Sequence, residues 1–235
     1  ARDRRTRNGV EQKATTNVKQ SFNDNTNSEI NPVLENQDVT TDSALESIIK
    51  NGTRFERLLA RRLRPLLKNT RLVIVRDLTA IDTATASEFL TGANGIYEYT
   101  IDTITLLAGD GTSNTTFLHE AVHAATLGII TNSINDSDSV SSRVNELREE
   151  LIEQMYEAEL KYSIDKENGK TNPELDLIVE RGDIFGDVTE FIAYGITQPE
   201  MQEFLLTVPT TITRADAVAV TGLSKFINII RQLFS

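Results

Sequence analysis

The stretch of sequence that decides the fold is TFLHEAVHA, residues 116–124. Within it, His119 and His123 stand four positions apart, and Glu120 directly follows the first histidine. Positions i and i+4 of an α-helix lie on one face, one turn apart, so both imidazoles can reach one metal ion. Glu120 then lies beside that ion, where it can take a proton from an attacking water molecule. The stretch therefore predicts a helix that carries two metal ligands and a general base.

The histidine content of the chain supports this interpretation. The chain has two histidines in all, and both lie in this motif. The alternative is a coincidental match on an ordinary helix, which requires every histidine to fall at this spacing with a glutamate in place. The neighbouring residues are mostly apolar, so the helix is expected to be buried, and two buried imidazoles without a ligand cost free energy. We therefore favour zinc (Zn2+), which binds imidazole nitrogen readily and keeps one position for water in catalytic sites.

A third protein ligand is expected, because catalytic zinc sites combine three side chains with one water molecule. The chain contains no cysteine and no third histidine, so the third ligand of a mononuclear site is an aspartate or glutamate, or less favourably a tyrosine. We choose Glu190, in the apolar stretch TEFIAYG of residues 189–195. The alternative is a capping box, because Asp187 precedes Glu190 at the required spacing. The other acidic candidates, in order of preference, are Asp187 and Asp183, followed by Glu149, Glu153 and Glu157.

Two further residues are candidates for supporting roles. Tyr194 comes four residues after Glu190 and could donate a hydrogen bond to an oxyanion. A tyrosine packed in the core is the more common reading of such a position. Thr126, one turn beyond His123, could orient a metal ligand. No residue is assigned to any cofactor other than the metal.

Composition excludes several classes of protein. The 235 residues carry a net charge of −11, which argues against a protein that binds nucleic-acid backbones through a basic face. The exception is a short basic cluster at Arg2, Arg4, Arg5 and Arg7, which could contact nucleic acid or an acidic partner. No apolar run approaches the ~20 residues that span a membrane, and no signal-peptide pattern opens the sequence. Because the first residue is Ala1, we expect a processed form or a fragment of a longer polypeptide.

The chain divides into a polar arm and one folded domain. Residues 1–40 show no helix or strand periodicity, so we expect an arm that is disordered or ordered by a partner. The folded domain is expected to cover residues 41–235. Strands are predicted at residues 71–76, 95–100 and 102–107, the last two as a possible hairpin. Helices are predicted at residues 41–49, 55–67, 117–127, 144–162, 174–181, 187–195, 199–206 and 223–234.

Further residues predict where helices begin and end and where loops lie. Ser113 and Asn114 can cap the histidine-bearing helix, and Gly128 is well placed to end it. Residues 131–142 are expected to form a loop, and residues 210–216 are expected to be loose. The order of elements, with few strands among many helices, predicts an α+β fold with a small sheet.

The chain resembles the zincin-like metallopeptidase domains of large polyvalent phage proteins and other virion-associated proteins. The resemblance covers about residues 43–235 and rests on TFLHEAVHA, on EFIA at 190–193 and on TQPEMQ at 197–202, in that order. It implies a zincin-like fold, in which a small mixed β-sheet packs on the active-site helix and further helices follow. It also implies zinc held by His119, His123 and Glu190, with Glu120 as general base. Many members carry an acid where Tyr194 stands, which puts a role for this position in doubt.

The resemblance further implies a zinc-dependent endopeptidase that acts on a protein or peptide substrate. In zincins, a strand just before the active-site helix forms the edge that pairs with extended substrate; otherwise the strands at 95–107 only complete the core. A phage protein would lie in the virion or, after delivery, in the host cytoplasm, and the arm at 1–40 could contact other virion proteins. The alternative is a virion structural or ejected protein that keeps the zinc-binding fold without turnover. A metal-dependent hydrolase of non-peptide substrates is a third possibility.

Overall fold

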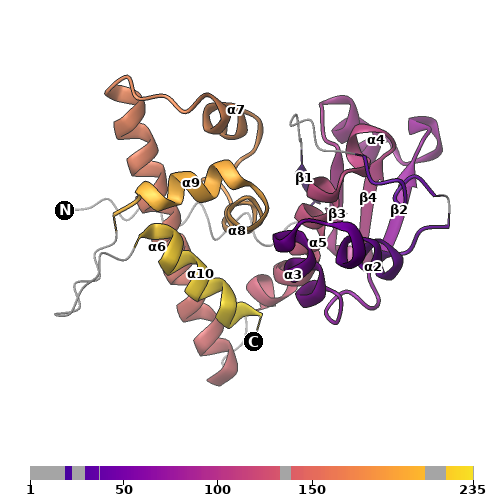
Figure 1. Ribbon diagram of the computed structural model, residues 1–235, viewed down its shortest axis with the longest axis horizontal. Helices are drawn as coiled ribbons and strands as arrows, with labels where there is room; N and C mark the ends of the chain where they lie inside the picture. The colour runs from indigo at the N-terminus through magenta and orange to yellow at the C-terminus, as the bar shows by residue number, and fades with distance from the viewer. Residues whose placement is uncertain (1–18, 23–29, 37, 133–138, 210–220, 235) are drawn as a thin grey trace. The chain divides into compact units, whose positions relative to one another are not determined.

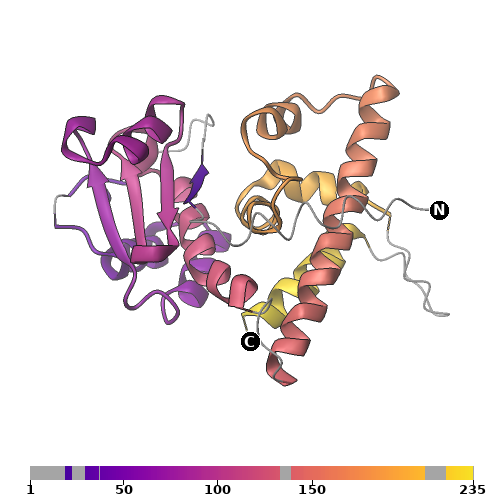
Figure 2. The ribbon, with the colours of Figure 1, turned by 180° about the vertical axis from the view of Figure 1, so that it is seen from behind.

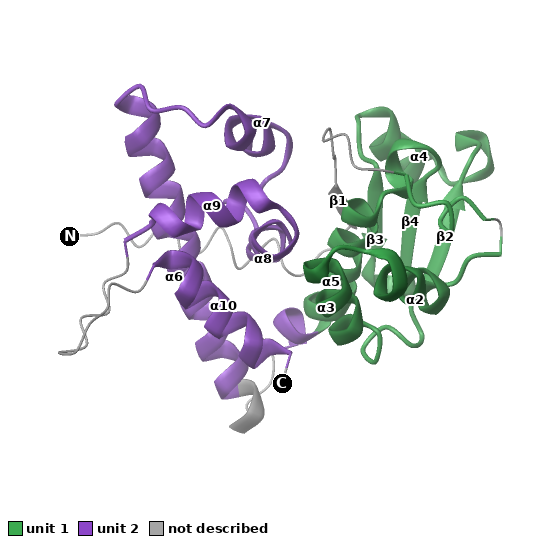
Figure 3. Cartoon of the chain, in the orientation of Figure 1, with its two compact units in different colours: residues 1–128 green, residues 129–235 purple. Residues whose placement is uncertain are grey.

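The computed structural model describes residues 19–22, 30–36, 38–132, 139–209 and 221–234. The chain forms two compact units, residues 1–128 and 129–235 (Figure 3). Two features of the sequence lie outside the described residues, namely the basic cluster near the N-terminus and the segment at 210–216 that was expected to be loose.

The first unit contains a four-stranded mixed sheet with strand order β1-β3-β4-β2 (Figure 1). Its strands are β1 (Lys19–Phe22), β2 (Arg71–Val75), β3 (Gly95–Glu98) and β4 (Thr103–Leu107). β3 pairs antiparallel with both β1 and β4, whereas β2 runs parallel to β4. The three strands predicted from the sequence, and the hairpin of β3 with β4, are confirmed. β1 was not expected, because it lies within the polar stretch of residues 1–40.

Helices accompany this sheet in the first unit. They are α2 (Thr41–Asn51), α3 (Arg54–Leu63), α4 (Thr83–Leu90) and α5 (Asn114–Asn132). One face of the sheet has a core in which Val75 and Ile96 pack with Phe89 of α4. The helix predicted at residues 55–67 ends earlier than expected, at Leu63, since Pro65 cannot continue a helix. α4 was not expected from the sequence.

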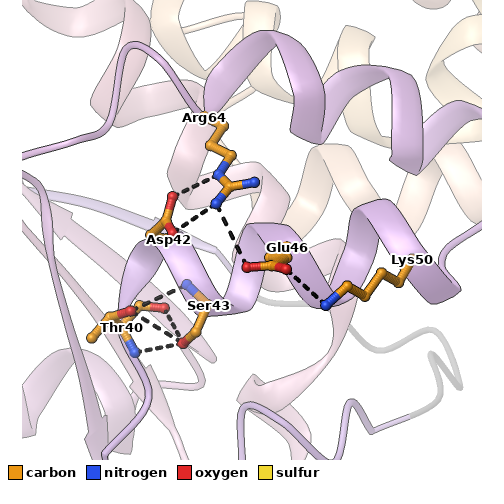
Figure 4. Close-up of polar contacts among 6 residues, drawn as sticks. All are labelled: Thr40, Asp42, Ser43, Glu46, Lys50 and Arg64. Atoms are coloured by element: carbon orange, nitrogen blue, oxygen red, sulfur yellow. Dashed lines mark hydrogen bonds and ion pairs between the residues drawn. The ribbon is translucent and has the colours of Figure 1, made fainter.

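Capping and ion pairs fix the start of α2 (Figure 4). Thr40 and Ser43 form a capping box, in which each side chain accepts a hydrogen bond from the other's backbone amide. Arg64, just after α3, contacts Asp42 in α2 through two hydrogen bonds of 2.6 and 2.8 Å, which lower the pKa of the Asp42 carboxyl. These side chains are exposed, so the pair contributes little to stability and mainly orients the end of α3 toward α2.

The residues just before α2 belong to the packed part of the first unit. Leu34 is completely buried. The amide of Asn31 donates to the carbonyl of Thr112 (2.8 Å), and its side chain donates to Asn114 at the start of α5 (2.7 Å). Glu35 accepts hydrogen bonds from the Gly109 amide and the Thr112 hydroxyl. The domain boundary expected at residue 40 stays a prediction, but residues 31–35 contact the loop that leads into α5.

The histidine-bearing helix begins as predicted and ends later. Ser113 caps α5, because its hydroxyl oxygen accepts a hydrogen bond from the amide of Thr116 (3.0 Å). The prediction that Gly128 ends the helix is wrong, since α5 continues to Asn132. Gly128 does not take the positive φ that a helix-ending glycine needs. The apolar residues on both sides of it, Leu127 and Ile130, are buried, which favours continuing the helix.

The second unit is helical in its described part. Its helices are α6 (Ser139–Glu167), α7 (Pro173–Arg181), α8 (Val188–Thr197), α9 (Pro199–Thr207) and α10 (Gly222–Leu233). Phe191 of α8 and Phe226 of α10 meet edge to face, with ring centroids 5.6 Å apart. A side chain at Gly195 would collide with the Phe226 ring, so this glycine allows α8 and α10 to approach closely.

These elements confirm the predicted α+β class with a small mixed sheet (Figures 1 and 2). The finer assignment to the zincin fold stays a prediction. Among the described residues, no helix combines the length and the apolar character needed to cross a membrane.

Candidate metal centre

The two histidines meet inside the first unit. His119 and His123 lie one turn apart on α5, and both are completely buried. Their Nε2 atoms are 3.0 Å apart, and the two rings are tilted by 70°. Two nitrogens bound to one tetrahedral zinc ion at about 2.05 Å lie about 3.3 Å apart. The observed separation is close to this value. It also suits a hydrogen bond between two neutral imidazoles, one Nε2 donating to the other.

The helix presents these rings within an apolar environment. Phe117, Ala121 and Val122 are completely buried, so α5 is enclosed on more than the histidine face. Thr126 is buried as well, and its hydroxyl donates to the carbonyl of Val122 (2.8 Å). Its one hydroxyl proton therefore goes to the helix backbone, while the hydroxyl oxygen can still accept a hydrogen bond. An orienting role for Thr126 stays a prediction.

Glu120 lies against the sheet at a glycine whose role was not expected from the sequence. The carboxylate side chain is completely buried. A Cβ atom placed on Gly95, the first residue of β3, would lie 2.8 Å from Cγ of Glu120 and 2.9 Å from Cγ2 of Thr116. The φ angle of Gly95 is not positive, so space rather than backbone conformation demands glycine here. No local sequence pattern predicts this contact, because it joins a strand to a helix.

Glu190 lies in the first turn of α8 and is 5% exposed. The helix cap comes from Asp187, which accepts hydrogen bonds from the amide and the hydroxyl of Thr189, each 2.7 Å long. Asp187, a reserve candidate for the metal, is thus engaged in capping. Of the other reserve candidates, Asp183, Glu149 and Glu153 are exposed, and Glu157 is half-buried. Glu190 is the buried acid among those considered.

One group of ligand-type side chains stands out in the described part of the chain. His119 and His123 in the first unit and Glu190 in the second are side chains of the kinds that bind metal ions. All three residues are buried. Two imidazole nitrogens and one carboxylate oxygen suit zinc, and they also suit other first-row divalent metals. The donor set therefore fits a transition-metal ion without fixing which one.

Tyr194 occupies a packed position in the second unit. It is 2% exposed. A Cβ atom on Gly182, just after α7, would lie 2.2 Å from the hydroxyl oxygen of Tyr194 and 2.7 Å from Cζ. The missing side chain at Gly182 therefore makes room for the phenol, which fits the reading of Tyr194 as a core residue.

Comparison with known proteins gives no relative. No protein-family model matches the chain, and neither a curated protein nor a solved structure matches it. The function is therefore inferred from the residues of the site itself.

Proposed function

We propose that this chain is a zinc-dependent endopeptidase in which His119, His123 and Glu190 bind the metal and Glu120 is the general base. One observation carries the proposal: two buried imidazoles on one helix bring their Nε2 atoms to 3.0 Å, with a buried glutamate next to the first of them. This arrangement supplies two metal ligands and a base from five consecutive residues.

Burial is the physical reason to expect a bound ion. Imidazole and carboxylate groups lose their hydration when they are buried, and the loss costs free energy unless a partner replaces the water. A divalent cation is a partner that satisfies two imidazoles and a carboxylate at once.

Each residue then has a distinct task. Bound zinc supplies a Lewis acid that polarises a carbonyl oxygen and lowers the pKa of a water molecule. Glu120 accepts the proton that this water loses as it attacks, and passes the proton to the amine that leaves. The buried surroundings of Glu120 exclude bulk water, so the carboxylate is held in place for this transfer. Gly95 keeps β3 close to Glu120 without displacing it.

Peptide is the proposed substrate class, because β3 lies against Glu120 and a β-strand can bind an extended peptide through its backbone groups. Location in a phage virion, or in the host cytoplasm after delivery, is a further part of the proposal and rests on the family resemblance alone. The alternative function, a virion structural or ejected protein with a zinc-binding fold and no turnover, differs from the proposed one in activity and not in metal content.

The experiment measures zinc content and peptide cleavage on the full chain. The wild type is expected to hold one zinc ion and to cleave a pool of quenched fluorescent peptides. Glu120→Gln is expected to keep the zinc and to lose cleavage by about 10²–10⁴-fold, the usual contribution of a general base.

The assignment of the third ligand is tested separately. Glu190→Ala should weaken zinc binding by more than about 100-fold, because a direct ligand contributes more than the outer residues that support it. Glu149→Ala, an exposed acid on α6, is the matched control and should bind zinc like the wild type. Unchanged zinc affinity in Glu190→Ala would remove Glu190 from the site. A wild type that holds zinc and cuts no peptide would favour the structural alternative.

A further inference from the structure

The edge of the sheet next to Glu120 is already occupied by the chain itself. β1 pairs antiparallel with β3, with Phe22 opposite Gly95 and Lys19 opposite Glu98. Gly95 is the residue whose Cβ position lies 2.8 Å from Glu120. Directly opposite residues of an antiparallel pair have Cα atoms about 4.5–5.5 Å apart. The backbone at Phe22 therefore lies one strand spacing from the residue that contacts the proposed base.

β3 has two edges, and the sheet order shows what each one holds. One edge pairs with β4, which is an interior strand of the sheet. The other edge pairs with β1, which is the outermost strand (Figure 2). An extended peptide that adds to β3 can reach it on the β1 side alone. Substrate and β1 therefore require the same row of backbone hydrogen-bonding groups.

The N-terminal segment is also held near the start of α5. Ile30 forms an isolated antiparallel bridge with Ser113, and the amide of Asn31 donates to the carbonyl of Thr112 (2.8 Å). Seven residues, 23–29, connect Phe22 to this anchor in the sequence. A segment tethered over so short a distance has a local concentration on the order of millimolar at its binding edge. It competes with any free peptide of lower concentration.

We propose that the β1-facing edge of β3 is a surface that binds one extended peptide, and that residues 19–22 of this chain are its resident and displaceable occupant. The proposal rests on the proposed function, since it states how substrate reaches Glu120. A peptide binds when β1 leaves, and the chain is less active while β1 is paired with β3.

Several properties of β1 suit an occupant that can leave. It has four residues and pairs with one neighbouring strand. Lys19 is a poor strand former, and Phe22 is the one residue of the four with high β-propensity. Removal of β1 leaves β3 paired with β4, and β4 paired with β2, so the rest of the sheet is retained.

A reversible disulfide tests the need for β1 to leave. The chain has no cysteine, so Lys19→Cys combined with Glu98→Cys introduces one thiol pair into a clean background. These residues are directly opposed, and their Cα separation falls within the range that a disulfide spans. The oxidised full chain is expected to cleave the peptide pool at least tenfold more slowly than the same sample after reduction. The single variant Lys19→Cys should not respond to oxidation or reduction in this way.

Peptide binding gives a readout that does not depend on activity or metal. The probe is a fluorescent peptide with the sequence of residues 17–24, NVKQSFND, and its anisotropy is measured with metal-free full chain. Gln20→Pro and Ser21→Pro each remove one backbone donor, and in an edge strand one of two neighbouring donors faces the partner strand. At least one of these variants should bind the probe tenfold or more tightly than the wild type. Ser21→Ala keeps its donor and should match the wild type.

The outcomes separate the two proposals. If the locked chain binds no probe and the reduced chain binds it, but neither cleaves any peptide, the occupant is established and the endopeptidase function is not. Equal cleavage by the oxidised and reduced chains overturns the occupant and leaves the endopeptidase in place. Failure of the two introduced thiols to cross-link, together with wild-type probe binding by both proline variants, overturns the occupant as well.

Discussion

Gly95→Ala is the substitution that most directly probes how Glu120 is positioned. The new Cβ would lie 2.8 Å from Cγ and 3.0 Å from Oε1 of Glu120. Ordinary contact begins at 3.4 Å, so the Glu120 side chain or the strand must move by at least 0.6 Å. The new Cβ would also lie 2.9 Å from Cγ2 of Thr116, so a shift of the strand toward Thr116 cannot relieve the clash.

A displacement of this size predicts a definite loss of activity. A misplacement of about 1 Å costs about 100-fold in rate, so a shift of 0.6 Å or more corresponds to a loss between about 10-fold and 100-fold in kcat/KM. This loss equals about 1.4–2.7 kcal/mol of transition-state stabilisation. The metal ligands are not touched, so zinc content should equal that of the wild type.

The assay combines kinetics on the quenched peptide pool with zinc analysis and thermal unfolding. Gly128→Ala is the matched control, because it places the same methyl group on α5 against the exposed ring of Tyr99 at 3.3 Å. It should keep full activity and gain up to about 1 kcal/mol from helix propensity. The reasoning is refuted if Gly95→Ala keeps wild-type kcat/KM, or if it loses activity only in proportion to lost zinc or lost folded protein.

Three further predictions concern stability. Glu35→Gln should lower the free energy of unfolding at neutral pH by about 1–2 kcal/mol. The Thr112 hydroxyl and the Gly109 amide lower the pKa of Glu35, so its contribution to stability is present above the ordinary value of 4.5 and is lost as pH falls below it. In urea unfolding at several pH values, the free energy of unfolding of the variant should therefore fall less toward acid pH than that of the wild type. Leu34→Ala should cost about 2–5 kcal/mol in chemical denaturation, whereas a loss under 1 kcal/mol would contradict its burial in the first unit. Removal of zinc by a chelator should lower the unfolding midpoint, since an ion at 100 times its Kd stabilises the native state by about 2.7 kcal/mol, and a midpoint that ignores both chelator and added zinc would count against a metal site.

Local patterns predicted the elements that local interactions determine. The 3.6-residue spacing around His119 and His123 placed them on one helix, and the β-branched run at Arg71 became β2. The choice of Glu190 came from exclusion, because no cysteine and no third histidine were present. Its burial agrees with that choice, while its role as a ligand stays a prediction.

Contacts between distant segments were not readable from the sequence. β1 exists through its pairing with β3, and its residues show no strand pattern of their own. Gly95 looks like any glycine at a strand end, and its role depends on where α5 places Glu120. Gly128 carried a valid local signal for a helix end, but burial of Leu127 and Ile130 outweighed it.

The pairing of β1 with β3 also orders events during synthesis of the chain. A protein emerges from the ribosome with its N-terminus first and begins to fold in that order. Lys19–Phe22 emerges long before Gly95–Glu98, so β1 has no partner while α2 and α3 can already pack on each other. Contacts between residues far apart in sequence also form slowly, because closing the long loop costs entropy first. The earliest described segment to be synthesised is therefore among the last to find its place in the sheet.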